Sequence, residues 1–205
     1  MTGALVAGLL AGFGIAVPVG AIAAYLVTLT ARTNLRTGAS AALGVATADG
    51  LYALAAVAGG AVVVPLVRTV QTPLRWTSAA VLLALAAHGT VKALRQRHDA
   101  RPDEPRLTAR NAYFGLLGLT LLNPLTVVYF AALVLGGGGG SATGPAQRTV
   151  FVLAAFAASA GWQLLLACGG ALLGRALTGP RARLLTALAS STLIAGLATH
   201  LALSG

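Results

Sequence analysis

Long stretches without a charged side chain dominate this sequence. Residues 2–31 contain no Asp, Glu, Lys or Arg, and residues 37–67 contain only Asp49. Charged residues make up 9% of the chain, whereas soluble domains carry roughly 25%. A helix needs about 20 apolar residues to cross a bilayer, so each stretch holds one crossing. We therefore expect an all-α membrane protein with six transmembrane helices, at about residues 3–31, 37–67, 73–94, 108–136, 147–174 and 182–203.

The basic residues fall in the short gaps between these stretches. The formal net charge is +10, and with the N-terminus outside, eleven of the 14 Lys and Arg residues lie in inward loops. Because positive residues collect on the cytoplasmic side, we expect a multi-pass protein of the bacterial inner membrane with both termini outside. A nucleic-acid partner would require a folded basic face, and we expect none. No Lys or Arg precedes the first apolar stretch, so we expect no cleaved signal peptide.

One polar loop, residues 95–110, divides the chain into two halves of three helices each. We treat residues 1–205 as a single transmembrane domain, with repeat one at about 1–94, a cytoplasmic loop at 95–110 and repeat two at about 111–205. Because each half holds an odd number of helices, the second half enters the membrane from the opposite side. The two repeats are therefore expected to be inverted, as in many secondary transporters.

The first helix of each half carries a proline near its middle. Pro18 is followed by Gly20 in one, and Asn123 precedes Pro124 in the other. Proline removes a backbone donor and clashes with the preceding turn, and matched interruptions of this kind are typical of transporter binding sites. We therefore expect both helices to be broken at mid-membrane depth and the two breaks to lie together. Ordinary proline kinks are the alternative interpretation.

Asp49 is the only acidic residue inside an apolar stretch, and Tyr52 shares its helix face. A carboxylate at this depth is costly, so Asp49 should face the protein interior. It could serve as a proton carrier or as the counter-ion of a substrate ammonium group. The alternative is a structural carboxyl hydrogen-bonded to a neighbour. In the second half, Trp162 and Gln163, with Ser159, occupy the corresponding place; polar groups there could equally be interhelical hydrogen bonds.

Other functional classes find less support in the sequence. The lone Cys168 excludes a multi-cysteine metal site, and we expect no cofactor and no metal. A membrane-embedded enzyme acting on lipid or quinone would need clustered polar catalytic residues, and a channel would need charge rings or carbonyl filters. We expect the lipid bilayer and a small-molecule substrate as partners. Two Gly-x-x-x-Gly motifs permit close helix packing and are weak evidence for a homo-oligomer.

Three motifs carry a resemblance to a known family: GIAVPVG at residues 14–20, GVATADGLY at 44–52 and LTLLNPLT at 119–126. Together they resemble the LysE family of bacterial amino-acid exporters, and the resemblance extends over the whole chain. One departure is Ala21, where members usually have a second proline, so the first break should rest on Pro18 and Gly20 alone. The resemblance implies export of an amino acid or a related metabolite, driven by the proton gradient. The expected substrate- and ion-binding residues are Pro18, Gly20, Asp49, Tyr52, Asn123, Pro124, Trp162 and Gln163.

Overall fold

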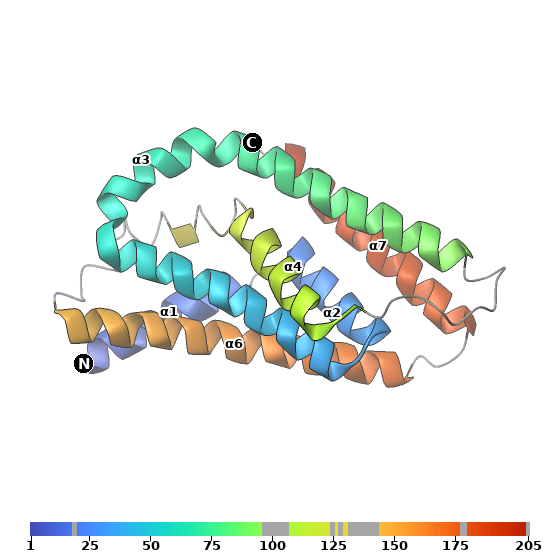
Figure 1. The fold of residues 1–205 in the computed structure, drawn as a ribbon, viewed down its shortest axis with the longest axis horizontal. Coiled ribbons are helices and arrows are strands. Elements are labelled where there is room, and N and C mark those ends of the chain that lie inside the picture. The colour runs from blue at the N-terminus through green and yellow to red at the C-terminus, as the bar shows by residue number, and fades with distance from the viewer. Residues whose placement is uncertain are drawn as a thin grey trace.

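The computed structural model describes residues 1–17, 20–95, 107–123, 126, 129–130, 144–176 and 180–203. Regular structure within these residues is helical, as the apolar stretches predicted (Figure 1). Pro18, Pro124 and most of the 95–110 loop lie outside the described residues. The helices are α1 (Thr2–Ala16), α2 (Ala21–Arg32), α3 (Leu35–Arg95), α4 (Ala109–Leu121), α6 (Pro145–Ala176) and α7 (Pro180–Leu203).

The first expected helix is divided into α1 and α2, whose axes meet at 77°. Gly20 precedes α2 with extended backbone angles, φ −107° and ψ −172°. Val17, the residue before Pro18, keeps helical angles (φ −68°, ψ −39°), so the interruption follows it. Proline removes a backbone N–H and clashes with the preceding turn, which is why a helix commonly ends or kinks there. Ala21 is the first helical residue of α2, a position at which proline is also well tolerated. The alanine at this place therefore leaves the interruption intact.

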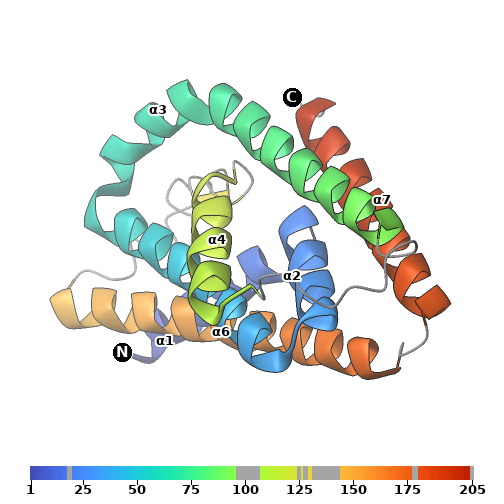
Figure 2. The same cartoon turned by 45° about the vertical axis from the view of Figure 1, so that its right-hand side comes forward.

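The second and third expected helices form one continuous helix, α3. The gap expected at residues 68–72 was wrong: this segment reads RTVQT and contains neither Gly nor Pro, so nothing in it ends a helix. The chain instead reverses direction by bending within α3, which forms an arch (Figures 1 and 2). We call residues 35–58 the first limb and residues 76–95 the second limb.

Glycines bring the broken first helix close to α6. Gly8 packs against Phe151 and Ala154, and Gly12 packs against Ala155 and Ala158. Beyond the break, Gly170 and Gly174 of α6 pack against Val27 and Ala31 of α2. Residue numbers rise together along both contacts, so α1 and α2 each cross α6 in a parallel rather than an antiparallel sense. Both Gly-x-x-x-Gly motifs are therefore used within the chain, and neither is evidence for a dimer.

The first limb of α3 packs on α4 in the same way. Gly44 lies against the backbone of Tyr113, and the Tyr113 hydroxyl donates to Thr47 Oγ1 at 3.0 Å. Further along, the Tyr52 hydroxyl reaches the carbonyl of Leu121. Numbers again rise together, so the first limb and α4 run in the same direction. The second limb packs beside α7 instead, where Leu82 belongs to one buried cluster with Ile194.

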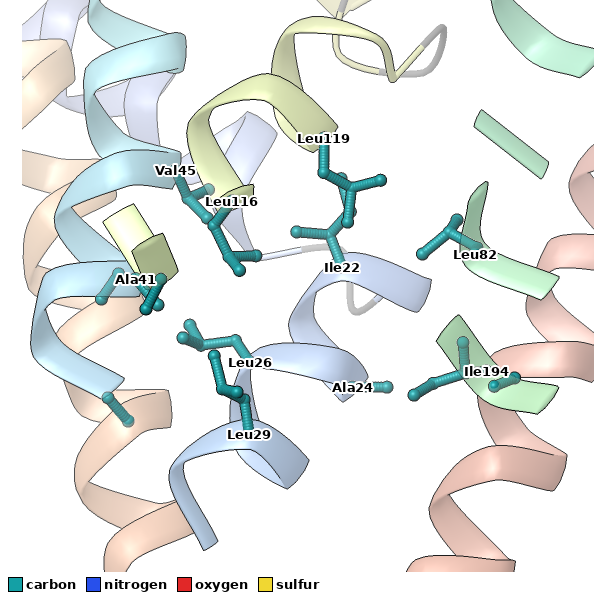
Figure 3. Close-up of a cluster of buried hydrophobic side chains, with 14 residues drawn as sticks. Ile22, Ala24, Leu26, Leu29, Ala41, Val45, Leu82, Leu116, Leu119 and Ile194 are labelled. Atoms are coloured by element: carbon teal, nitrogen blue, oxygen red, sulfur yellow. The ribbon is translucent and has the colours of Figure 1, made fainter. Parts of the chain in front are cut away.

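The arrangement places α2 and α4 inside a frame formed by α3, α6 and α7 (Figure 2). Their apolar side chains meet in a buried cluster that includes Ile22, Leu26 and Leu116 (Figure 3). Outward surfaces are also apolar: Leu153, Leu165 and Leu172 of α6 are each at least 59% exposed. Exposed apolar surface on this scale is unusual for a soluble monomer.

Two helical stretches among the described residues are long and apolar enough to cross a membrane. They are Leu35–Ala58, in the first limb, and Pro145–Arg175, in α6. The bent pair of α1 and α2 counts as a third if it forms one span, and Trp76–His88 of the second limb is a shorter apolar stretch. The fold is therefore that of a helical membrane protein.

Candidate functional site

Asp49 and Ser159 join the two halves of the chain inside the protein. Asp49 lies on the first limb and is 3% exposed, and Ser159 lies on α6 and is fully buried. The Ser159 hydroxyl donates to Asp49 Oδ2 at 2.6 Å. The next residue, Gly50, faces Phe156 of α6, where an added Cβ would lie 3.3 Å from the ring. A small residue thus lets the two helices approach closely enough for this hydrogen bond.

Two hydroxyls from α3 hold the carboxyl end of α4. The Tyr52 hydroxyl donates to the carbonyl of Leu121 at 2.6 Å, and the Ser78 hydroxyl donates to the carbonyl of Leu122. The last carbonyls of a helix have no partner within it, and Pro124 has no N–H to offer. Tyr52 lies on the first limb and Ser78 on the second. Both limbs of α3 therefore satisfy the backbone groups that the end of α4 exposes.

Tyr52 and Asp49 share a helix face but contact different neighbours. The ring of Tyr52 stacks on Phe130, with ring centroids 5.5 Å apart. Asp49 instead contacts α6 through Ser159. Ser78 did not emerge from the sequence, because serine and threonine in apolar helices commonly bond to their own backbone, as Thr77 does here with the carbonyl of Pro73.

Asn123 follows α4 in a tight local turn. Its backbone N–H donates to the carbonyl of Thr120 at 3.0 Å, and its side-chain Nδ2 donates to Thr126 Oγ1 at 3.1 Å. The helices that flank the two predicted breaks lie close together. Ile22, in the first turn of α2, and Leu119, in the last turn of α4, belong to the same buried cluster and point toward one another (Figure 3). The approach of the breaks themselves involves Pro18 and Pro124, outside the described residues.

Trp162 and Gln163 carry the two buried side-chain polar atoms that find no hydrogen-bond partner in the described part of the chain. They are Trp162 Nε1, a donor, and Gln163 Oε1, an acceptor. Gln163 is 5% exposed. Both residues lie on α6 between the positions that contact Gly12 of α1 and Val27 of α2. They are therefore level with the interval between α1 and α2, where Gly20 lies.

The remaining titratable and metal-binding side chains are scattered. Within the described residues, no group of three His, Cys, Asp or Glu side chains is placed to hold a metal ion. Cys168 and His88 are exposed. The site is thus built from one carboxyl, several hydroxyls, two amides, an indole and the ends of interrupted helices.

Comparison with known protein families adds one finding. The family model described as LysE type translocator matches residues 13–205, a span that includes every residue of the candidate site. No curated protein and no solved structure matches the chain.

Proposed function

Because the chain belongs to the LysE type translocators, a family of membrane transport proteins, we propose that it exports amino acids or related small metabolites. The proposed location is the bacterial inner membrane, with six spans and both termini outside. Efflux is driven by protons that enter in exchange for the solute. The observation that supports this most directly is the buried carboxyl of Asp49, hydrogen-bonded to Ser159 between the first limb and α6.

The packing of the helices supports an inverted repeat. In the proposed topology, α1 with α2 is the first span of one half, and the span beginning with α4 is the first of the other. The first span of repeat one, α1 with α2, packs on the second span of repeat two, α6. The first span of repeat two, which begins with α4, packs on the second span of repeat one, the first limb of α3. Each pair runs in one direction, as a two-fold relation between inverted halves requires.

Asp49 is suited to exchange one cation for another. A neutral carboxyl is cheaper to bury than a charged one, so an empty site favours a bound proton. An ammonium group arriving beside Asp49 would favour the charged carboxylate and release that proton. Proton and substrate therefore compete for one group, which is the condition for antiport. Ser159 can donate its hydrogen bond in either state.

The proposal is tested by flux measurements in membrane vesicles prepared from cells that produce the protein. Wild type should give saturable uptake of an amino acid into inverted vesicles with an acidic interior. Asp49→Asn should reach the membrane at normal levels, because an amide is cheaper to bury than a charge, but should lose gradient-driven accumulation. Ser191→Ala, which alters a buried hydroxyl on α7, is the control and should retain transport.

Substrate exchange without a gradient separates the two roles of Asp49. If Asp49 carries only the proton, Asp49→Asn retains exchange while losing accumulation. If Asp49 also binds the ammonium group, both are lost in folded protein. Normal gradient-driven transport by Asp49→Asn would reject both roles and leave a structural carboxyl.

A further inference from the structure

Two adjacent residues of α6 present one free donor and one free acceptor inside the protein. Trp162 Nε1 and Gln163 Oε1 are buried and have no hydrogen-bond partner among the described residues. Buried polar groups are nearly always paired, because leaving one unpaired forfeits the hydrogen bond it made with water. A ligand that supplies both an acceptor and a donor would satisfy the two atoms together.

The spacing along α6 directs Gln163 toward Asp49 and α2. Gln163 follows Ser159 by four residues and precedes Gly170 by seven, so the three share one helix face. Ser159 bonds Asp49, and Gly170 packs against Val27 of α2. Gln163 therefore lies between the carboxyl of Asp49 and the beginning of α2.

Trp162 lies on the face of α6 that packs against α1. Trp162 follows Ala155 by seven residues and Ala158 by four, and both alanines pack against Gly12. It therefore lies beyond that contact, near the end of α1 at Ala16. Trp162 and Gln163 together flank the interval that separates α1 from α2.

The amino end of α2 adds donors to this place. Its N-cap is Gly20, no side chain caps it, and its first turn contains no acidic residue. Ala21 contributes an N–H that a proline at the same position would lack. The first N–H groups of a helix have no partner within it and favour a negative charge. A carboxylate is the natural occupant of such an end.

We propose that the first turn of α2, together with Trp162 and Gln163 of α6, binds the head group of an α-amino acid zwitterion. The substrate carboxylate accepts from Trp162 Nε1 and from the first amides of α2. The substrate ammonium donates to Gln163 Oε1 and to Asp49, which is the one buried charged side chain among the described residues. This inference rests on the proposed function and deepens it: the protein selects the shared amino-acid head group, so an amine without the carboxylate or an acid without the amine is excluded.

Tryptophan fluorescence can observe this site directly. The chain has two tryptophans, and Trp76 is 54% exposed on α3. Trp76→Phe leaves Trp162 as the sole tryptophan in a protein with an unaltered site. Purified Trp76→Phe would be titrated with the standard L-amino acids, and then with the decarboxylated amine and the deaminated acid of the strongest responder. We expect the amino acid to change Trp162 emission and both analogues to leave it unchanged.

Two substitutions test the individual hydrogen bonds in the flux assay. Trp162→Phe and Gln163→Met should each raise the KM for amino-acid transport about tenfold or more, since a hydrogen bond to a charged group contributes roughly that factor. Trp76→Phe is the control and should transport as wild type does. Gln163→Met should unfold no earlier than wild type on heating in detergent, because it removes an unpaired polar atom and keeps the shape. A loss of transport without a loss of stability is not expected of a residue with a structural role only.

Failure of this inference differs from failure of the proposed function. Amino-acid transport with an unchanged KM in both variants, or equal transport of the decarboxylated amine, would overturn the zwitterion site and leave amino-acid export standing. An absence of transport of any amino acid by wild type would overturn both. An unchanged Trp162 emission at concentrations that saturate transport would also overturn the site, even if a variant failed to fold.

Discussion

Replacing Gly12 by alanine should force α1 away from α6, whereas replacing Gly14 should not. A Cβ added at Gly12 would lie 2.8 Å from the Cβ of Ala158 and 2.9 Å from the Cα of Ala155. A Cβ at Gly14 meets nothing within 4 Å. The two positions lie on the same helix and receive the same methyl group, so any gain in helix propensity is common to both. The difference between the variants therefore isolates the packing of α1 on α6.

The expected size of the difference follows from the distances. Carbon atoms attract best at roughly 3.5–4.0 Å, so the new methyl group at Gly12 lies about 0.7 Å inside the lower end of that range. The partners are a helix backbone and a short side chain, and neither can move aside without a shift of the whole helix. Overpacking of this kind costs roughly 1–3 kcal/mol. Gly12→Ala should be less stable than Gly14→Ala by about that amount.

Equilibrium unfolding in mixed micelles, followed by circular dichroism, measures the difference between the two variants. Transport should fall in parallel for Gly12→Ala, because Ser159 follows Ala158 directly on α6 and Trp162 lies one turn further along. Equal stability and equal transport of the two variants would refute the close packing of α1 on α6. It would also remove the basis for placing Trp162 beside the end of α1.

Three further predictions follow from the site and the topology. Tyr52→Phe should lower stability by about 0.6–1.7 kcal/mol, the range for hydrogen bonds between membrane helices, in the same unfolding assay. Asn123→Leu should abolish flux while the protein reaches the membrane at normal levels, because leucine cannot make the hydrogen bonds of the Asn123 amide. Unaltered flux would contradict a role for Asn123. In a Cys168→Ala background, Gly205→Cys should react with an impermeant maleimide on intact cells, whereas Ala100→Cys should react only after permeabilisation; the reverse pattern would reject the orientation.

Proline and glycine located two helix ends correctly, although α3 continues through Pro65 and Pro73. The interruption between α1 and α2 follows from the residues at 16–20, and α4 ends at Leu121, just before Asn123 and Pro124. The gap expected at residues 68–72 was wrong because it was inferred from the charged residues between two apolar stretches. Arg68 follows one apolar stretch and Arg75 precedes the next, but charged residues do not end a helix, and α3 continues through both.

The partners of the site residues were harder to predict than the residues themselves. Asp49 was singled out because a lone carboxylate in an apolar stretch is costly, and its burial agrees with that argument. Its hydrogen bond to Ser159 spans 110 positions, and no spacing rule within one helix relates them. Tyr52 bonds a backbone carbonyl of α4, which no side-chain pattern encodes. The roles proposed for these residues in transport remain predictions.

The contact between the broken first span and α6 also bears on how these helices could move. On both sides of the interruption, each close approach includes a residue with no rotatable side chain: Gly8, Gly12, Ala155 and Ala158 before it, and Gly170 and Gly174 after it. Glycine and alanine lose no rotamer entropy on burial, and they have no rotamers to rearrange when one surface slides over another. A shear of small amplitude along this contact would therefore meet little steric friction. Substituting a longer side chain anywhere along it should slow exchange between conformations before it prevents folding.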